Sequence, residues 1–206
     1  MALGNLYLVS APSGTGKTSL MKELSNRLNN LYISISYTTR EKRSSESERK
    51  SYHYISKKEF NTLIANNFFI EYAEIYSNYY GTDYRSINTK LHSGIDVILE
   101  IDWQGASQVK QKHTDSKLIF IAPPNLETLE ERLTLRNQDT DDVIQNRLQK
   151  AHDELLTYKH YDYLIINDDF ENAVDELCAI ITANRLLLNY RQINNQFNKL
   201  NFFNVK

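Results

Sequence analysis

A glycine-rich loop near the N-terminus constrains the fold of this chain more than any other feature. The apolar run Leu6–Ser10 precedes the loop, and leucines at every fourth position follow it. Glycines let backbone N–H groups turn toward phosphate oxygens, and the first turn of a following helix adds partial positive charge. This strand–loop–helix context predicts a Walker A loop that binds a nucleoside triphosphate. The loop residues are Ala11, Pro12, Ser13, Gly14, Thr15, Gly16, Lys17 and Thr18.

All eight loop residues are candidate ATP ligands, and two have specific roles. Lys17 is placed to reach the β- and γ-phosphates, and the Thr18 hydroxyl is placed to bind Mg²⁺. Ala11 stands where such loops usually begin with glycine, so the motif departs from the general pattern. A glycine-rich turn without a ligand is the plainer alternative. The combination of glycines, lysine and threonine in this context favours phosphate binding.

Short apolar runs separated by helical patterns predict an α/β fold. Besides Leu6–Ser10, strands are expected at Val97–Ile101, Leu118–Ala122, Tyr163–Ile166 and Leu31–Tyr37. Strands that alternate with helices imply a mostly parallel central sheet covered on both faces, the three-layer arrangement of P-loop proteins. The predicted core comprises residues 1–37 and 86–206, with a lid at about 132–150. Residues 38–85 are polar and tyrosine-rich, lack a long apolar run, and are predicted to form an inserted lobe.

Composition limits the classes of partner. The 206 residues are 41% hydrophobic and 24% charged, as in ordinary globular domains, and the net charge of −2 does not favour nucleic acid or a membrane surface. One cysteine, Cys178, excludes an internal disulfide. The N-terminus does not resemble a signal peptide, and no run is long enough to span a membrane, so a cytoplasmic location is expected. The asparagine-rich tail after Leu188 fits an assembly contact, as in a homo-oligomer, and a disordered end equally well.

Four further motifs follow the loop along the chain. They are SYTTR at 36–40, FIEYAE at 69–74, NYYGT at 78–82 and LEIDWQG at 99–105. Each motif alone is modest support, and the charged segment after SYTTR would by itself be read as a solvated surface loop. Together with APSGTGKT, in this order and spacing, the set resembles the guanylate kinase family. The resemblance extends from Leu6 to about Arg185 and implies transfer of the γ-phosphate of ATP to GMP.

The resemblance also implies roles for residues of the inserted lobe and the strand ends. Arginine offers a planar fork of donors for the GMP phosphate, and a carboxylate can accept from both N1–H and the 2-amino group of guanine. Glu71 is the expected guanine reader, and Asp102 is expected to influence Mg²⁺ through water. The phosphate ligands are expected to be Arg40, Arg43, Tyr52 and Tyr80, and the remaining GMP-binding residues Ser36, Thr82, Glu100 and Asp102.

The family's lid is expected to fold over the ATP phosphates. Arg132 and Arg136 share one helix face, and Arg147 follows the interruption RNQDTDD. Solvated arginines or helix ion pairs are the plainer alternative. Asn167 matches a position near adenine, although it could equally cap the next helix. The expected catalytic residues are Lys17, Arg136 and Arg147, which would offset charge on the transferred group, and Arg40, which would hold the acceptor in line. Those expected to bind ATP beyond the loop are Arg132, Arg136 and Asn167.

Several departures from the family pattern and two competing functions stay open at this point. A kinase for another nucleoside monophosphate would share the fold, although SYTTR and NYYGT argue against it. A non-catalytic guanylate kinase-like module that binds phosphopeptides would have lost ATP binding, whereas Lys17 is present here. A GTPase would need an N-K-x-D element, which is lacking. The atypical residues are Lys42 in place of proline, Ser45, Arg49, Ser77 and Asn137 in place of glycine, and Glu100 in place of aspartate.

Overall fold

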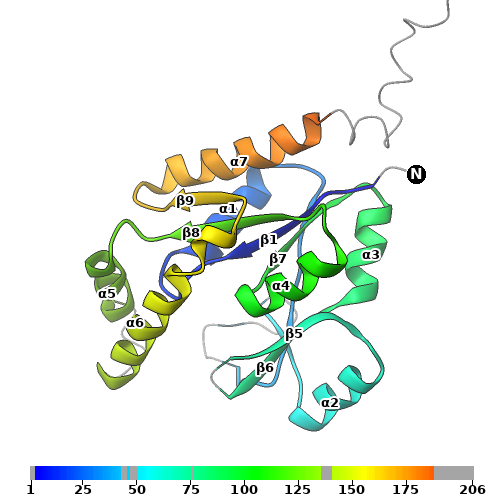
Figure 1. Ribbon diagram of the computed structural model, residues 1–206, viewed down its shortest axis with the longest axis horizontal. Helices are drawn as coiled ribbons and strands as arrows, with labels where there is room; N and C mark the ends of the chain where they lie inside the picture. The colour runs from blue at the N-terminus through cyan, green and yellow to red at the C-terminus, as the bar shows by residue number, and fades with distance from the viewer. Residues whose placement is uncertain (1–2, 43–45, 47–50, 76, 136–140, 188–206) are drawn as a thin grey trace, which may run out of the picture.

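The computed structural model describes residues 3–42, 46, 51–75, 77–135 and 141–187. Within these residues, β1 lies at the centre of a five-stranded parallel sheet with the order β2-β7-β1-β8-β9 (Figure 1). The predicted α/β fold with a parallel central sheet is therefore confirmed. The strands are β1 Leu6–Ser10, β2 Leu31–Ile33, β7 Asp96–Glu100, β8 Lys117–Ala122 and β9 Tyr163–Ile166.

The alternation of side chains along β1 explains why helices cover both faces of this sheet. Tyr7 and Val9 point into a core cluster with residues of α1 and α7, whereas Leu6 and Leu8 point into a second cluster with residues of α3 and α4. All four side chains are buried. The helices are α1 Lys17–Arg27, α3 Tyr84–His92, α4 Trp103–Lys112 and α7 Phe170–Leu186.

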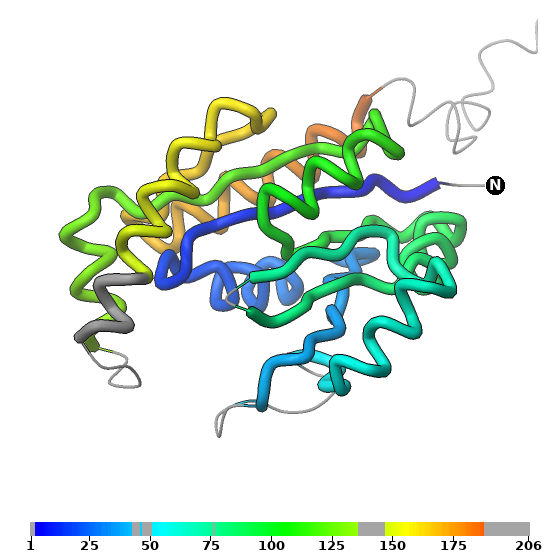
Figure 2. Tube along the Cα trace, turned by 60° about the horizontal axis from the view of Figure 1, so that its bottom comes forward, coloured from blue at the N-terminus to red at the C-terminus, as the bar shows by residue number. Residues whose placement is uncertain are grey.

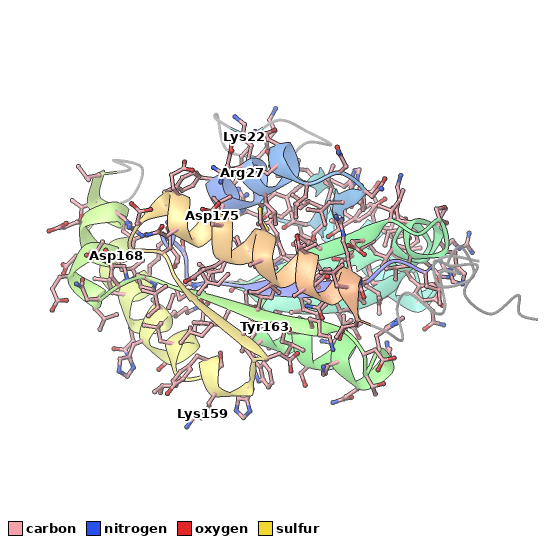
Figure 3. The ribbon with its side chains drawn as sticks, turned by 90° about the horizontal axis from the view of Figure 1, so that it is seen from above. Lys22, Arg27, Lys159, Tyr163, Asp168 and Asp175 are labelled. Atoms are coloured by element: carbon pink, nitrogen blue, oxygen red, sulfur yellow. The ribbon has the colours of Figure 1, made fainter. Side chains whose placement is uncertain are left out.

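Two polar contacts tie α7 to the rest of this layer. In Figure 3, Arg27 of α1 and Asp175 of α7 lie close together, and their side chains are 2.9 Å apart. At the far end of α7, Arg185 Nε donates to Oδ2 of the buried Asp96 at 2.6 Å, and the backbone N–H of Asn5 donates to its Oδ1 at 2.7 Å. The second contact is the stronger constraint, because an unpaired buried carboxylate would be costly.

A second sheet of mixed direction forms the inserted lobe, with the order β4-β3-β6-β5. Two expectations were wrong here. The strand expected at Leu31–Tyr37 divides into β2 and β3, which belong to different sheets, and a seven-residue strand, β5, occupies a region where no long strand was expected. The elements are β3 Tyr37–Thr38, β4 His53–Tyr54, α2 Lys57–Ala65, β5 Phe69–Ile75 and β6 Asn78–Asp83.

Two further helices stand beside the end of β1 from which the glycine-rich loop leaves (Figures 1 and 2). They are α5 Leu126–Leu135 and α6 Asp141–Leu155, followed by a short 3₁₀ turn at Tyr158–His160. Leu129 and Leu133 of α5 pack against Ala151 and Leu148 of α6. None of the described helices is both long and apolar enough to cross a membrane.

Candidate nucleotide site

The glycine-rich loop has the backbone shape that its sequence requires. Gly14 and Gly16 have φ angles of 98° and 96°, a region that glycine reaches without steric cost. A Cβ at Gly14 would also lie 2.9 Å from carbon atoms of Leu129 and Leu133, so this glycine lets the loop pack against α5. Ala11 is not among the described non-glycine residues with positive φ, so the alanine at this position carries no backbone strain.

Three side chains hold the centre of the loop, and two of them bind the carbonyl of Thr15. The Thr15 hydroxyl donates to the Pro12 carbonyl at 2.7 Å, and Asn167 Nδ2 donates to the Thr15 carbonyl at 2.6 Å. Arg132 reaches the same carbonyl at 3.4 Å and the Asn167 carbonyl at 3.1 Å. Asp169, whose side chain accepts from the Asn172 N–H, caps α7, so the alternative role of Asn167 as the cap was wrong. Asn167 and Arg132 thus brace the loop by binding the carbonyl of Thr15.

Carboxylates from the end of β7 stand beside the loop, because β7 and β1 are parallel neighbours. Lys17 Nζ is 3.8 Å from Glu100 Oε2, and Thr18 lies exposed in the first turn of α1. Asp102 caps α4, where its Oδ1 accepts from the Gly105 N–H at 2.9 Å. The fold therefore places Lys17, Thr18, Glu100 and Asp102 around one edge of the sheet.

Arg40 leaves β3 and makes a bidentate contact with Glu46. Its Nη2 lies 2.7 and 3.0 Å from the two carboxylate oxygens, and its guanidinium carbon lies 5.5 Å from the centre of the Tyr52 ring. The ring of Tyr80 is 5.9 Å from that of Tyr52, and burial raises the pKa of Tyr52 to about 12, so Tyr52 remains a neutral donor. Arg43, also expected here, lies outside the described residues.

Sequence reasoning missed Glu46, which lies in a segment of alternating charges that reads as a solvated loop. A spacing of six residues from Arg40 carries no periodic signal, so only the fold reveals the pair. The contact shows that the Arg40 guanidinium already holds a two-oxygen anion in this structure. A phosphate has the same kind of oxygen edge, and an arginine fork suits both.

Glu71 of β5 has 4% relative exposure, which is unusual for a carboxylate. It pairs in register with Thr82 of β6, whose hydroxyl lies 3.2 Å from the hydroxyl of Ser36. Burial raises the pKa of Glu71 to about 7, and hydrogen bonds from Thr82 offset that rise only in part. A buried carboxyl beside two buried hydroxyls makes a polar site within a largely apolar layer. The structure therefore brings together Glu71, Ser36 and Thr82, three of the residues expected to bind GMP.

The lid is described in part. Arg147 of α6 is half-buried, whereas Arg136 lies outside the described residues. Glu154 of the same helix was not singled out from the sequence, because one glutamate in a charged helix is not distinctive. Burial raises the pKa of Glu154 to about 7. The positive charge of Lys17 lowers this pKa, whereas the negative charge of Asp102 raises it. The end of α6 therefore contributes a carboxyl group to the region around the loop.

A Walker A loop on the central strand of a parallel sheet, next to a lobe with a buried carboxyl group, defines a P-loop protein of the nucleotide-kinase class. The family model described as "Guanylate kinase" matches residues 3–184. The chain therefore belongs to the guanylate kinase family.

Curated relatives and a solved structure agree with this assignment. The chain is 54% identical to the guanylate kinase of Buchnera aphidicola subsp. Acyrthosiphon pisum (strain APS) over 190 residues, which cover 91% of this chain and 92% of the relative. It is 48% identical to the guanylate kinase of Legionella pneumophila (strain Paris), covering 97% and 95%. The crystal structure of guanylate kinase from Anaplasma phagocytophilum has a TM-score of 0.75 and 31% identity, covering 91% and 89%.

Proposed function

We propose that this protein transfers the γ-phosphate of ATP to GMP and releases ADP and GDP. The observation that carries this proposal is the buried Glu71 carboxyl with Thr82 and Ser36 beside it, in the lobe next to the Walker A loop. A general triphosphate site would explain the loop but not a carboxyl that is buried in the adjoining lobe and whose pKa burial raises to about 7. The membership of the guanylate kinase family supports the same reading.

Base selection follows from hydrogen-bond chemistry at Glu71. Guanine presents two adjacent donors, N1–H and the 2-amino group, which one carboxylate can accept together. Adenine presents an unprotonated N1 at this position, so the ionised form of Glu71 would be a buried acceptor facing another acceptor in a complex with AMP. A site built around such a pair rejects the wrong partner far more strongly than an apolar pocket does. Glu71 is therefore proposed to set the preference for GMP.

The phosphate of GMP is proposed to replace Glu46 at Arg40. Tyr52 and Tyr80 lie beside that guanidinium and offer hydroxyl donors to further phosphate oxygens. Arg43 is proposed to add a second positive charge. Held this way, a phosphate oxygen of GMP is already the nucleophile, so no side chain needs to form a covalent intermediate.

In the transfer step, an oxygen of the GMP phosphate forms a bond to the γ-phosphorus. The bond from that phosphorus to the bridging oxygen breaks, and its electron pair leaves with ADP. Lys17, Arg136 and Arg147 are proposed to offset the charge that spreads over the transferred group. The backbone of the loop holds the donor phosphates, and Asn167 and Arg132 keep that backbone in place.

The residues near the loop fit a magnesium ion that arrives with ATP. Hydroxyl and carboxylate oxygens suit Mg²⁺, and Thr18 at the start of α1 and Asp102 at the end of β7 offer them at one edge of the sheet. Asp102 uses its carboxylate to cap α4 but keeps unused lone pairs for a water ligand. When bound, the ion neutralises charge on the β- and γ-phosphates.

The test is an acceptor panel with purified protein, ATP and Mg²⁺. ADP formation is followed with GMP, AMP, UMP or CMP in turn, for the wild type and for Lys17→Ala. The proposal expects strong turnover with GMP only, and nearly none in the variant. A preference for AMP would reject Glu71 as the base reader. A folded protein that no nucleotide stimulates would reject the enzyme and favour the phosphopeptide-binding alternative.

A further inference from the structure

One face of helix α4 contacts β5, the strand that carries Glu71. Gly105, Gln108 and Lys112 are three and four residues apart, so they share that face. Opposite them run Ile70, Glu71 and Tyr72 of β5. Figure 1 shows α4 on the side of the central sheet that faces the lobe, next to β5, and the two elements are in contact.

Two side chains of this face bind the backbone of β5. Gln108 Nε2 donates to the Tyr72 carbonyl at 2.8 Å, and its Oε1 accepts from the Tyr72 N–H at 3.2 Å. Lys112 Nζ reaches the Ile70 carbonyl at 3.3 Å. Because β5 is the last strand of its sheet, one edge of its backbone lacks a strand partner, and the amide of Gln108 supplies both bonds that a strand would supply at Tyr72.

The third contact is steric and involves the carboxylate itself. A Cβ at Gly105 would lie 2.7 Å from Glu71 Oε2 and 3.3 Å from its carboxyl carbon, while the next nearest atom, in Ile101, is 3.4 Å away. Glu71 is therefore the group that a side chain at Gly105 would displace. Gly105 has no positive φ that would require glycine, and alanine favours a helix over glycine, so local backbone preference does not explain this glycine.

We propose that Gly105 and Gln108 of α4 are positioning residues for Glu71 and thereby determine the selectivity for the purine base. The inference rests on the proposed function. It extends that function to two residues of α4 that do not contact GMP themselves and affect its binding only through β5 and Glu71. Ile70 is buried in the core cluster that includes α4 residues Ala106 and Val109, so β5 is anchored to the core on both sides of Glu71. The guanine-reading carboxylate is thus fixed relative to α4 as well as to the lobe.

The size of the expected effect follows from the geometry. In Gly105→Ala the carboxylate oxygen has to move by several tenths of an ångström, because contacts under 3.0 Å to a Cβ are not tolerated. A displacement of this order at a recognition group costs about tenfold to a hundredfold in kcat/KM. The loss should fall on KM for GMP, whereas KM for ATP should change less than about twofold, because the loop is braced by other residues.

Inosine monophosphate (IMP) provides a readout that a general loss of structure would not change. Its base keeps N1–H but lacks the 2-amino group, so the ratio of kcat/KM for GMP over IMP measures how well Glu71 reads that group. The experiment measures this ratio and the GMP KM in the wild type, Gly105→Ala and Gln108→Leu. Gln111→Leu is the matched control, since Gln111 is an exposed glutamine of the same helix.

Shortening the carboxylate provides the decisive comparison. In a Glu71→Asp background the side chain is one methylene shorter and no longer reaches the added Cβ, so Gly105→Ala should change the GMP over IMP ratio less than about threefold further. A wild-type ratio in Gly105→Ala and Gln108→Leu, or the same fold-change with and without Glu71→Asp, would overturn the positioning role. Wild-type protein that does not phosphorylate GMP would instead reject the proposed function itself.

Discussion

The raised pKa of Glu71 predicts that GMP binding depends on pH in a defined direction. The folded protein holds a proton on this carboxyl up to about pH 7, whereas guanine needs the ionised form to accept its two donors. With a pKa of about 7, the ionised fraction falls from about ten elevenths at pH 8 to about one eleventh at pH 6. The affinity for GMP should therefore fall about tenfold over this interval.

Isothermal titration calorimetry with GMP measures this directly when it is repeated in buffers of different ionisation enthalpy. Below pH 7, binding should release close to one proton, because the bound complex holds Glu71 as the carboxylate. Glu71→Gln is the control, since it keeps the shape but has no proton to lose. The phosphate of GMP also titrates in this range, and it does so equally in both proteins. An identical pH dependence in wild type and Glu71→Gln would refute the assigned role.

The same proton also links pH to stability. Between about pH 4.5 and 7, the folded state binds a proton at Glu71 that the unfolded state has lost. The free energy of unfolding should therefore decrease as the pH rises through this range, as far as this group contributes. Urea unfolding at several pH values should show a weaker decrease for Glu71→Gln.

Three further predictions concern other parts of the molecule. Asn167→Ala should raise KM for ATP about tenfold, because the hydrogen bond from Asn167 to the loop is lost. Asn184→Ala, which removes an equally buried asparagine of α7, should leave KM for ATP unchanged, and steady-state kinetics measures both. Ser77→Gly should stabilise the protein by about 1 kcal/mol in urea unfolding because Ser77 has φ of 60°, whereas Ser93→Gly at φ of −85° should not. Asp96→Ala should lower the unfolding free energy by about 3 kcal/mol and leave KM for GMP unchanged; an unchanged melting temperature would contradict the buried pair.

The sequence predicted most strands of the central sheet well because they are short and largely apolar, and the inner strands β1, β7 and β8 are buried on both faces. Leu6–Ser10 and Tyr163–Ile166 have the expected bounds, and the strands expected at Val97–Ile101 and Leu118–Ala122 are shifted or extended by one residue. The loop was predictable for a different reason, since glycines at defined positions are required by its backbone shape. In both cases the local sequence determines the local structure.

The lobe was less predictable because polar residues carry its buried surface. Glu71 and Thr82 are buried, so β5 and β6 do not read as apolar runs even though the strands are long and well paired. Leu31–Tyr37 alternates like one strand, but the chain changes sheet after Ile33. The charged and hydroxyl side chains needed at a binding site thus interrupt the apolar pattern by which these strands could be predicted.

Individual hydrogen bonds between distant segments could not be predicted from the sequence. Nothing in the sequence places Gln108 against the backbone of Tyr72, or Asn167 against the loop, because these pairs are 36 and 152 residues apart. The resemblance to the guanylate kinase family identified Asn167 as a site residue, and its place near adenine remains a prediction. The fold adds a bracing role that no motif indicates.

The measurement that tests the account most directly is the preference for GMP over AMP in Glu71→Gln and in Glu74→Gln. Both residues lie on β5, but Glu71 is buried and Glu74 is exposed. Transfer of labelled γ-phosphate from ATP to each acceptor gives the ratio of kcat/KM values. We expect Glu71→Gln to lower this ratio by at least about a hundredfold, because the carboxylate that accepts from guanine is lost, and Glu74→Gln to leave it within about twofold. An unchanged ratio in Glu71→Gln, or an equal loss in both variants, would contradict this expectation.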